Sequence, residues 1–341
     1  MKMSCWEGLA VPADISKGRG RFLVFPQDGI GTKAGDIVER LKEYADRQLS
    51  FESDALNAML GIFRRYQVMG VYQIWGIPFL ADNKRERIDQ NFTVALGWEP
   101  LSSKMRRREG FPSWSWVGWE NRRHLDVPWG SGTEWYGSNQ ENPHRGIGVH
   151  VMVTQLAAGR LPDVKMPLSD YVQCVQSGAD FTQFSKSITV SSASSKCRVS
   201  SRYQPYRESK VMFSGTNEID IEFPADLDRY SLNIVSRIMG AAGTHCGTLS
   251  GQWLDAFYLG THVYPRSLSR VMLSFLIVRN VEGSDEYTRV GCLRLTLRGP
   301  VKIKDTFLQV ESQESFNADD HLPSIYKSIT DSWTVKSFKL V

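Results

Sequence analysis

The first clear pattern along the chain is an amphipathic stretch that begins near residue 36. Apolar side chains recur there every three or four positions, and charged side chains fill most positions between them. The apolar set is Ile37, Val38, Leu41, Tyr44 and Ala45. This spacing places the set on one face of an α-helix. We expect Asp36 to cap the helix and Glu39 to complete a capping box.

A second stretch with helical spacing follows after a short connection. Its apolar set is Leu56, Met59, Leu60 and Phe63. Ser53 stands at the position of an N-cap, and Arg64 and Arg65 mark the expected end of the helix. Because only residues 48–52 join the two stretches, we expect the helices to pack against each other.

Beyond Gly70 short runs of aromatic and β-branched residues replace the helical spacing, as is typical of strands. The runs cover residues 71–79, 92–98, 149–153, 211–213, 219–223, 271–278, 290–297 and 335–341. Residues 230–239 fit either a strand or a short helix. A hairpin is expected around residues 282–285, where a polar turn that contains glycine separates two strand-like runs. Two polar stretches, 120–145 and 185–210, predict surface loops.

These elements predict an α+β fold in which an N-terminal helical hairpin packs on a large, mainly antiparallel, β-rich region. Residues 1–75 would hold the hairpin, and residues 76–341 would hold the β-rich region with its long loops. The two parts would form separate domains or one continuous domain. A chain of 341 residues is long enough to bury a substantial core in either arrangement.

The stretch 111–119 concentrates three of the ten tryptophans of the chain within six residues. On an extended strand Trp114 and Trp116 would point to one face, and the small residues beside them would point to the other. Each buried indole removes on the order of 200 Å² of apolar surface from water. We therefore interpret this run, which Pro112 opens, as a core anchor and not as a platform on which a ligand stacks.

Composition and charge add few constraints on function. The net charge is only +4, and the five cysteines are far apart, without a C-x-x-C pair. Reduced thiols in an intracellular protein are the simplest account of these cysteines. No secretory signal is visible at the start, and no run approaches the ~18 apolar residues of a membrane span. The histidines show no metal-ligand spacing. We expect a soluble, cytoplasmic protein without a metal or a cofactor.

One strand-like run carries a candidate catalytic pattern. Alternation places the carboxylates of Glu218, Asp220 and Glu222 on one face of a strand. The pattern resembles the E-x-D-x-E strand of β-glucanases such as lichenases, and retaining glycosidases do use two carboxyl groups close together. That resemblance would make Glu218 the nucleophile and Glu222 the general acid, assisted by Asp220. A half-exposed strand with an acidic outer face gives the same letters, and we favour this interpretation.

Nucleic-acid binding is a third class of function to weigh. Arg106, Arg107 and Arg108 precede the tryptophan run, and basic residues beside aromatic ones can form a platform for single-stranded nucleic acid. The charge of the whole chain is too small and too dispersed to require such a partner. We favour a solvated loop of arginines beside a buried aromatic cluster.

Two of these stretches together resemble the C-terminal half of fungal heterokaryon incompatibility (HET domain) proteins. Residues 38–61 resemble the helical run of that family, and residues 111–116 resemble its P-S-W-S-W hallmark. The signature positions are Tyr44, Arg47, Asp54, Gly61, Pro112, Trp114 and Trp116. Residues 3–9 resemble the W-E-C segment that follows the HET domain, and residues 95–98 resemble a later strand of the family.

The resemblance implies a region that accompanies the HET domain, which is the TIR-like part of the family linked to programmed cell death. Because the segment 3–9 would follow that domain, we expect no counterpart of the HET domain or of its trigger residues in this sequence. A non-catalytic binding or regulatory role in fungal non-self recognition follows, with protein partners that are either a second copy or full-length relatives. The β-glucan-active hydrolase is the alternative.

Overall fold

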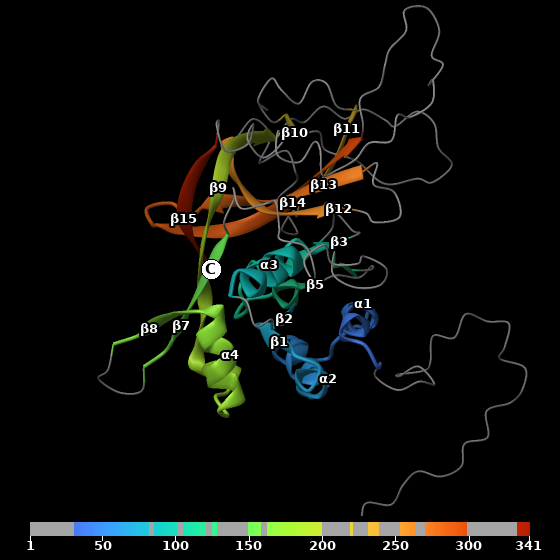
Figure 1. Ribbon diagram of the computed structural model, residues 1–341, viewed down its shortest axis with the longest axis vertical. Helices are drawn as coiled ribbons and strands as arrows, with labels where there is room; N and C mark the ends of the chain where they lie inside the picture. The colour runs from blue at the N-terminus through green and yellow to red at the C-terminus, as the bar shows by residue number, and fades with distance from the viewer. Residues whose placement is uncertain are drawn as a thin grey trace, which may run out of the picture.

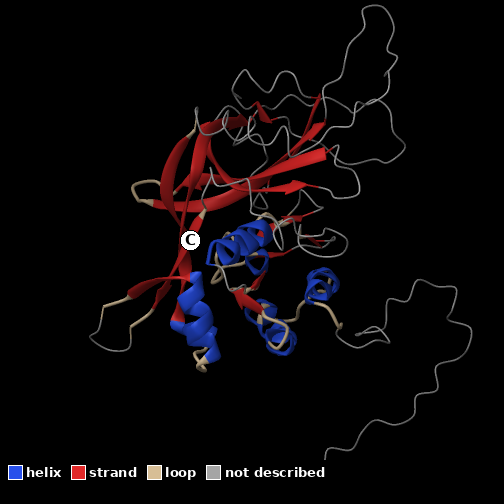
Figure 2. Ribbon diagram, in the orientation of Figure 1, coloured by secondary structure: helices blue, strands red, loops and turns tan. Residues whose placement is uncertain are grey.

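A large β-sheet with helices gathered on one side makes up most of the structure in Figure 1, and Figure 2 shows the same layers by colour. The computed structural model describes residues 31–81, 85–100, 105–120, 125–127, 149–157, 162–199, 219–220, 231–238, 253–263, 270–298 and 333–341. A few short helices and a mainly antiparallel sheet confirm the α+β class. None of the helices in these residues is both long and apolar enough to cross a bilayer.

Both N-terminal helices form where the apolar spacing predicts them. Helix α1 (Ile37–Ala45) buries Ile37, Val38, Leu41 and Tyr44. Helix α2 (Asn57–Gln67) buries Met59, Phe63 and Tyr66. The side chain of Tyr44 reaches from α1 to the segment before α2, where its hydroxyl donates to the carbonyl oxygen of Asp54 at 3.3 Å.

The predicted helix caps are wrong, because a 3₁₀ turn precedes each helix. The Asp36 carboxylate accepts hydrogen bonds from the backbone N–H groups of residues 32–33, at 2.9 and 3.0 Å. It accepts none from the first N–H groups of α1, although Asp36 stands at the N-cap position. Glu39 accepts a bond from a lysine one turn further on in place of a capping box. Ser53 lies inside the 3₁₀ turn Glu52–Ala55 and does not cap α2.

Residues 92–96 belong to helix α3 (Arg85–Leu96) and not to a strand, so that part of the strand prediction is wrong. From Ile88 to the end of α3, every residue except Gln90 is buried. The helix lies between the sheet and the other helices (Figure 1), so polar side chains such as Asn91 are buried too. Since polar and apolar residues are buried alike, no amphipathic period marks this helix.

The large sheet contains strands from the second half of the chain. They are β7 (His150–Gln155), β8 (Val164–Pro167), β9 (Phe184–Val199), β10 (Ile219–Asp220), β11 (Ser231–Ile238), β12 (Trp253–Val263), β13 (Arg270–Asn280), β14 (Glu286–Arg298) and β15 (Thr334–Leu340). The strand order is β11-β14-β13-β12-β9-β7-β8. Strand β15 pairs antiparallel with β9 and parallel with β14. Five strands, β9, β12, β13, β14 and β15, therefore close into a ring.

Strand β9 corrects the prediction of a surface loop for residues 185–199, and the rest of that predicted loop, residues 200–210, lies outside the described residues. Its first half pairs with β7 and β15, and its second half pairs with β12. Two serines of this polar stretch are buried and bonded to the neighbouring strands: the hydroxyl of Ser192 donates to the Tyr258 carbonyl at 2.6 Å, and that of Ser194 to the Thr334 carbonyl at 3.0 Å. Small hydroxyl side chains that find such partners fit the middle of a sheet.

Other strand predictions are confirmed. Strands β7 and β15 lie at the predicted runs, β13 and β14 form the hairpin around residues 282–285, and residues 231–238 form a strand and not a helix. The predicted run 211–213 and much of the loop 120–145 lie outside the described residues. Helix α4 (Leu168–Gln176), which was not predicted, follows β8 and precedes β9 in the chain. It buries the side chains of Leu168, Tyr171 and Val172.

Three two-stranded pairings of the described residues lie outside the large sheet. Strands β1 (Val71–Ile74) and β2 (Ile77–Leu80) form one, β3 (Glu99–Pro100) pairs with β6 (Leu125–Asp126), and β4 (Arg106–Arg107) pairs with β5 (Trp119–Glu120). The predicted boundary after residue 75 falls within the turn of the β1–β2 hairpin. Described residues on both sides of this boundary belong to one apolar core. Helix α2 contacts β1 and α1 contacts β6, whereas α3 contacts the large sheet at β7 and β12.

Trp114 is at the centre of this core, since its side chain has no exposed surface. We expect Trp114→Ala to lower the free energy of unfolding by about 3 to 5 kcal/mol, because it leaves a large cavity. Urea unfolding followed by circular dichroism measures the change. Trp253→Ala is the matched control: that indole is 54% exposed, so its loss should cost less than about 1 kcal/mol. Equal costs for the two variants would contradict the burial of Trp114.

Candidate functional site

The tryptophan stretch is not a strand, which corrects the prediction that both indoles point to one face. A turn leads into a 3₁₀ helix at Trp116–Gly118, and the Ser115 hydroxyl caps this helix by accepting the Val117 N–H at 3.2 Å. Trp114 donates its indole N–H to the carbonyl of Lys186 on β9, and Trp116 donates to the carbonyl of Gly76 in the β1–β2 turn. Both indoles are buried, so the interpretation as a core anchor is confirmed.

Hydrogen bonds to backbone carbonyls hold this stretch in place. The indole donors and their carbonyl partners are Trp75 and Ser185, Trp98 and Trp114, Trp114 and Lys186, Trp116 and Gly76, and Trp119 and Ser113, at 2.7 to 3.0 Å. The hydroxyls of Ser113 and Ser115 donate to the carbonyls of Val341 and Trp75. A buried donor without a partner would cost about 1–3 kcal/mol, so these bonds specify one arrangement of the segments.

The turn between β1 and β2 fits closely against this stretch. Trp75 and Gly76 both have positive φ angles, 47° and 89°, as in the two-residue turns that match the twist of a hairpin. Tryptophan rarely adopts that conformation. Here its indole is held by the Ser185 carbonyl and by an edge-to-face contact with Phe181, with ring centroids 5.4 Å apart. A Cβ atom on Gly76 would lie 2.4 Å from the side chain of Val117.

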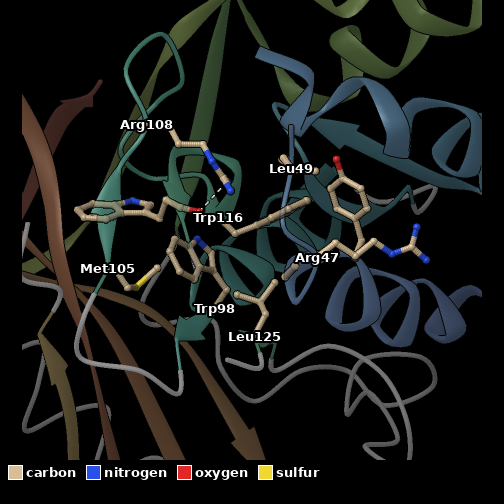
Figure 3. A pocket seen from close by; sticks show the side chains of 10 residues that line it. Arg47, Leu49, Trp98, Met105, Arg108, Trp116 and Leu125 are labelled. Atoms are coloured by element: carbon tan, nitrogen blue, oxygen red, sulfur yellow. Dashed lines mark hydrogen bonds between the residues drawn. The ribbon is translucent and has the colours of Figure 1, made fainter. Parts of the chain in front are cut away.

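A pocket opens between this stretch and the segment that ends α1 (Figure 3). It is lined by Tyr44, Ala45, Arg47, Leu49, Trp98, Met105, Arg108, Trp116, Trp119 and Leu125. The cavity itself is about 10 Å³, which is room for about one water molecule. Indole and phenol rings form most of the wall, and the lining contains two arginines and no acidic residue.

Arg108 is the buried cation of this pocket, with 6% of its surface exposed. One of its terminal nitrogens donates to the carbonyls of Val117 and Trp119, at 3.1 and 2.8 Å, while its Nε has no hydrogen-bond partner among the described residues. Burial lowers the pKa of Arg108, because the charged form loses hydration. Burial also raises the pKa of the neighbouring Tyr44, and the charge of Arg108 opposes that shift.

The arginine run is only partly the solvated loop that we favoured. Arg106 is exposed and forms ion pairs with Glu52 and Glu120, the latter at 2.8 Å. Arg107 donates to the carbonyls of its neighbour and of Gly118, both at 2.6 Å. These two guanidinium groups are occupied, and the nearby indoles are buried. The geometry therefore offers no stacking platform for nucleic-acid bases at this run.

Two further arginines, which sequence reasoning missed, lie behind the pocket at the C-terminal end of α3. The guanidinium of Arg289 stacks 4.0 Å from the ring centroid of Trp98 and donates to the carbonyls of Leu96, at 2.6 Å, and Trp98. Arg294 donates to the carbonyl of Gly97 at 3.0 Å. Cations are favourable at the negative end of a helix. Burial lowers the pKa of Arg289 to about 10. In the sequence Arg289 directly precedes the strand-like run 290–297, and Arg294 lies within it.

The structure brings several of the HET-like signature residues together. Tyr44, Arg47 and Trp116 line the pocket, and Asp54 accepts the Tyr44 hydroxyl through its carbonyl. Trp114 lies outside the pocket lining, although its carbonyl accepts the N–H of a lining indole. Pro112 opens the stretch, and its carbonyl accepts the Ser115 N–H at 3.3 Å. Gly61 stands apart on α2, where no atom lies within 4 Å of an added Cβ.

The candidate glycosidase residues are largely outside the described residues. Glu218 and Glu222 are not described, and of Asp220 only the backbone is, in strand β10, where it pairs with Arg198. Within the described residues, no group of His, Cys, Asp and Glu side chains is arranged to hold a metal ion.

Comparison of the chain with protein-family models, curated proteins and solved structures gave no match.

Two glycines should respond in opposite directions to the same substitution. Gly76→Ala would introduce the clash with Val117 at a positive φ angle, so we expect a loss of at least about 1 kcal/mol of stability. Gly61→Ala adds a methyl group in open space within α2, so we expect a gain of about 0.5–1 kcal/mol. Thermal melting of both purified variants tests this. Destabilisation by Gly61→Ala would show that α2 packs more closely than described.

Proposed function

We propose that this chain is a companion region of the HET family, with a non-catalytic binding or regulatory role in fungal non-self recognition. One observation supports the proposal most directly. The two stretches that carry the resemblance, residues 38–61 and 111–116, meet in the edge-to-face contact of Tyr44 with Trp116, with ring centroids 6.0 Å apart. Both residues belong to the one apolar core of the described residues, so the two stretches are parts of the same structural unit.

The chemistry of the pocket also favours binding over catalysis. Its described lining contains no carboxylate, imidazole or thiol, and these are the groups that most often transfer protons or attack a substrate. The lining instead offers the exposed guanidinium group of Arg47, which can meet a partner by charge. The partners that fit the proposal are proteins, either a second copy or full-length HET-family relatives, met in the cytoplasm.

Co-expression with a full-length HET-domain protein in a fungal host tests this function. We expect the chain alone to leave cells viable and to co-purify with the relative. We also expect it to change the fraction of cells that take up a membrane-impermeant dye once the relative is induced, because a companion region would restrain or release the HET domain. An unrelated protein expressed at the same level is the control. Absence of co-purification together with an unchanged death rate would contradict the proposal.

The alternative, hydrolysis of β-glucan by Glu218, Asp220 and Glu222, has a direct assay. We expect the purified chain to release no reducing sugar from mixed-linkage β-glucan, because we interpret the three carboxylates as an acidic strand face. If sugar is released, the variant Glu218→Gln identifies its source, with Glu282→Gln in the exposed β13–β14 turn as the matched control. Hydrolysis lost only in Glu218→Gln would replace the binding role by a catalytic one.

A further inference from the structure

One tryptophan of the described residues lies at the surface. The side chain of Trp253, the first residue of β12, is 54% exposed, whereas every other described tryptophan is at most 9% exposed. Five of those buried indoles donate to backbone carbonyls. Within the described residues no hydrogen bond or ring contact involves the indole of Trp253. A ring face and an N–H donor therefore remain for a partner, and tryptophan is enriched among the side chains that dominate protein–protein binding.

Two lysines share one carboxylate beside this indole. Asp255 stands two positions after Trp253, on the same face of β12, and is 6% exposed. The ammonium group of Lys196 on β9 lies 2.9 Å from one of its oxygens, and that of Lys336 on β15 lies 4.0 Å from the other. About half of each lysine side chain is exposed, 55% and 49%. The cluster therefore presents two positive charges for one negative charge.

The backbone register leaves this excess of positive charge in place. Arg198 is the register partner of Trp253, and Asp220 is the register partner of Arg198, so these positions add one cation and one anion. Exposed ion pairs add little to stability, and the fold does not explain why two lysines meet at Asp255. Each ammonium group carries three N–H donors. Donors therefore remain on both lysines for a second carboxylate, which would balance the charge of the cluster.

The chemistry of the cluster fits an acidic protein segment better than a nucleic acid. Proteins that bind single-stranded nucleic acid stack successive bases on several aromatic side chains along a basic groove. Among the described residues of β9, β12 and β15, Trp253 is the one exposed aromatic side chain. The net charge of the chain is only +4. One indole beside two lysines instead matches an apolar side chain next to a carboxylate in a short peptide segment.

We propose that Trp253, Lys196 and Lys336 form a docking site for an acidic segment of a protein partner. An aliphatic side chain of that segment covers the indole, and one of its carboxylates lies between the two ammonium groups. Covering the indole removes apolar surface from water, and the carboxylate complements the charge of the cluster. The identity of the partner as a full-length HET-family relative rests on the proposed function, whereas the site itself rests on the described residues alone.

Calorimetric titration of the purified full chain with an end-blocked peptide of sequence EELLEE tests the site. We expect saturable binding with a Kd of about 1 mM or tighter. The neutral peptide QQLLQQ should bind at least about fivefold more weakly, because it lacks the carboxylates. Equal affinity for the two peptides would overturn the role of the lysines, and no binding of EELLEE would overturn the site. A short oligothymidylate should bind more weakly than EELLEE, and tighter binding would overturn the assignment to a protein partner.

Variants locate the binding. Trp253→Ala should weaken binding of EELLEE by about fivefold, and it is expected to fold because the indole is exposed. The double variant Lys196→Gln with Lys336→Gln should weaken binding by about tenfold. Lys165→Gln, at an exposed lysine on β8, is the matched control and should leave the affinity unchanged. Unchanged affinity in both Trp253→Ala and the double variant, or an equal loss in the control, would overturn the site.

Co-purification with the full-length relative separates this site from the proposed function. We expect Trp253→Ala to recover less of the relative than the unchanged chain does at the same expression level. Equal recovery by the two chains would overturn the relative as the occupant of this site, even where the peptide binds. If the relative co-purifies with neither chain, the proposed function fails, and the peptide titration decides the site by itself.

Discussion

Each buried indole N–H group needs a hydrogen-bond acceptor, and the rest of this structure depends on that constraint. Trp114 and Trp116 bury their rings at 0% and 4% exposure, and each donates to a carbonyl of a segment far away in the chain, one on β9 and one in the β1–β2 turn. The serines beside them donate to further carbonyls. An unsatisfied donor in such a core would be costly, so the stretch fixes how the helices, the hairpin and the sheet meet.

The same constraint produces the pocket and its charge. Because residues 113–118 turn instead of extending, Trp116 and Trp119 stand beside α1 and leave a space that Arg108 enters from the end of β4. One terminal nitrogen of its guanidinium donates to the carbonyls of Val117 and Trp119, and its Nε has no hydrogen-bond partner among the described residues. Behind the pocket Arg289 and Arg294 occupy the carbonyl end of α3. The aromatic core therefore holds its buried cations through backbone carbonyls, those of the tryptophan turn for Arg108 and those of the helix end for Arg289 and Arg294.

The proposed family-level role is based on the contact between the two HET-like stretches and concerns what the whole region does for its relatives. Tyr44 and Trp116 form that contact inside the apolar core, so the two signature stretches belong to one structural unit.

The sequence by itself determined the elements whose patterns are local. The apolar stripe of α1, the hairpin around residues 282–285 and the burial of the tryptophans all follow from residue types and spacing. Only the tertiary structure decided the rest. Helix α3 buries polar and apolar residues alike from Ile88 to its end, Gln90 excepted, and β9 buries Ser192 and Ser194, so polarity does not mark the buried positions of either element. The hydroxyl of Ser192 finds its acceptor on β12, far away in the chain. The tertiary structure also decided where each indole of the tryptophan stretch lies. Trp114 and Trp116 donate to carbonyls far away in the chain, those of Lys186 and Gly76, which no local pattern predicts.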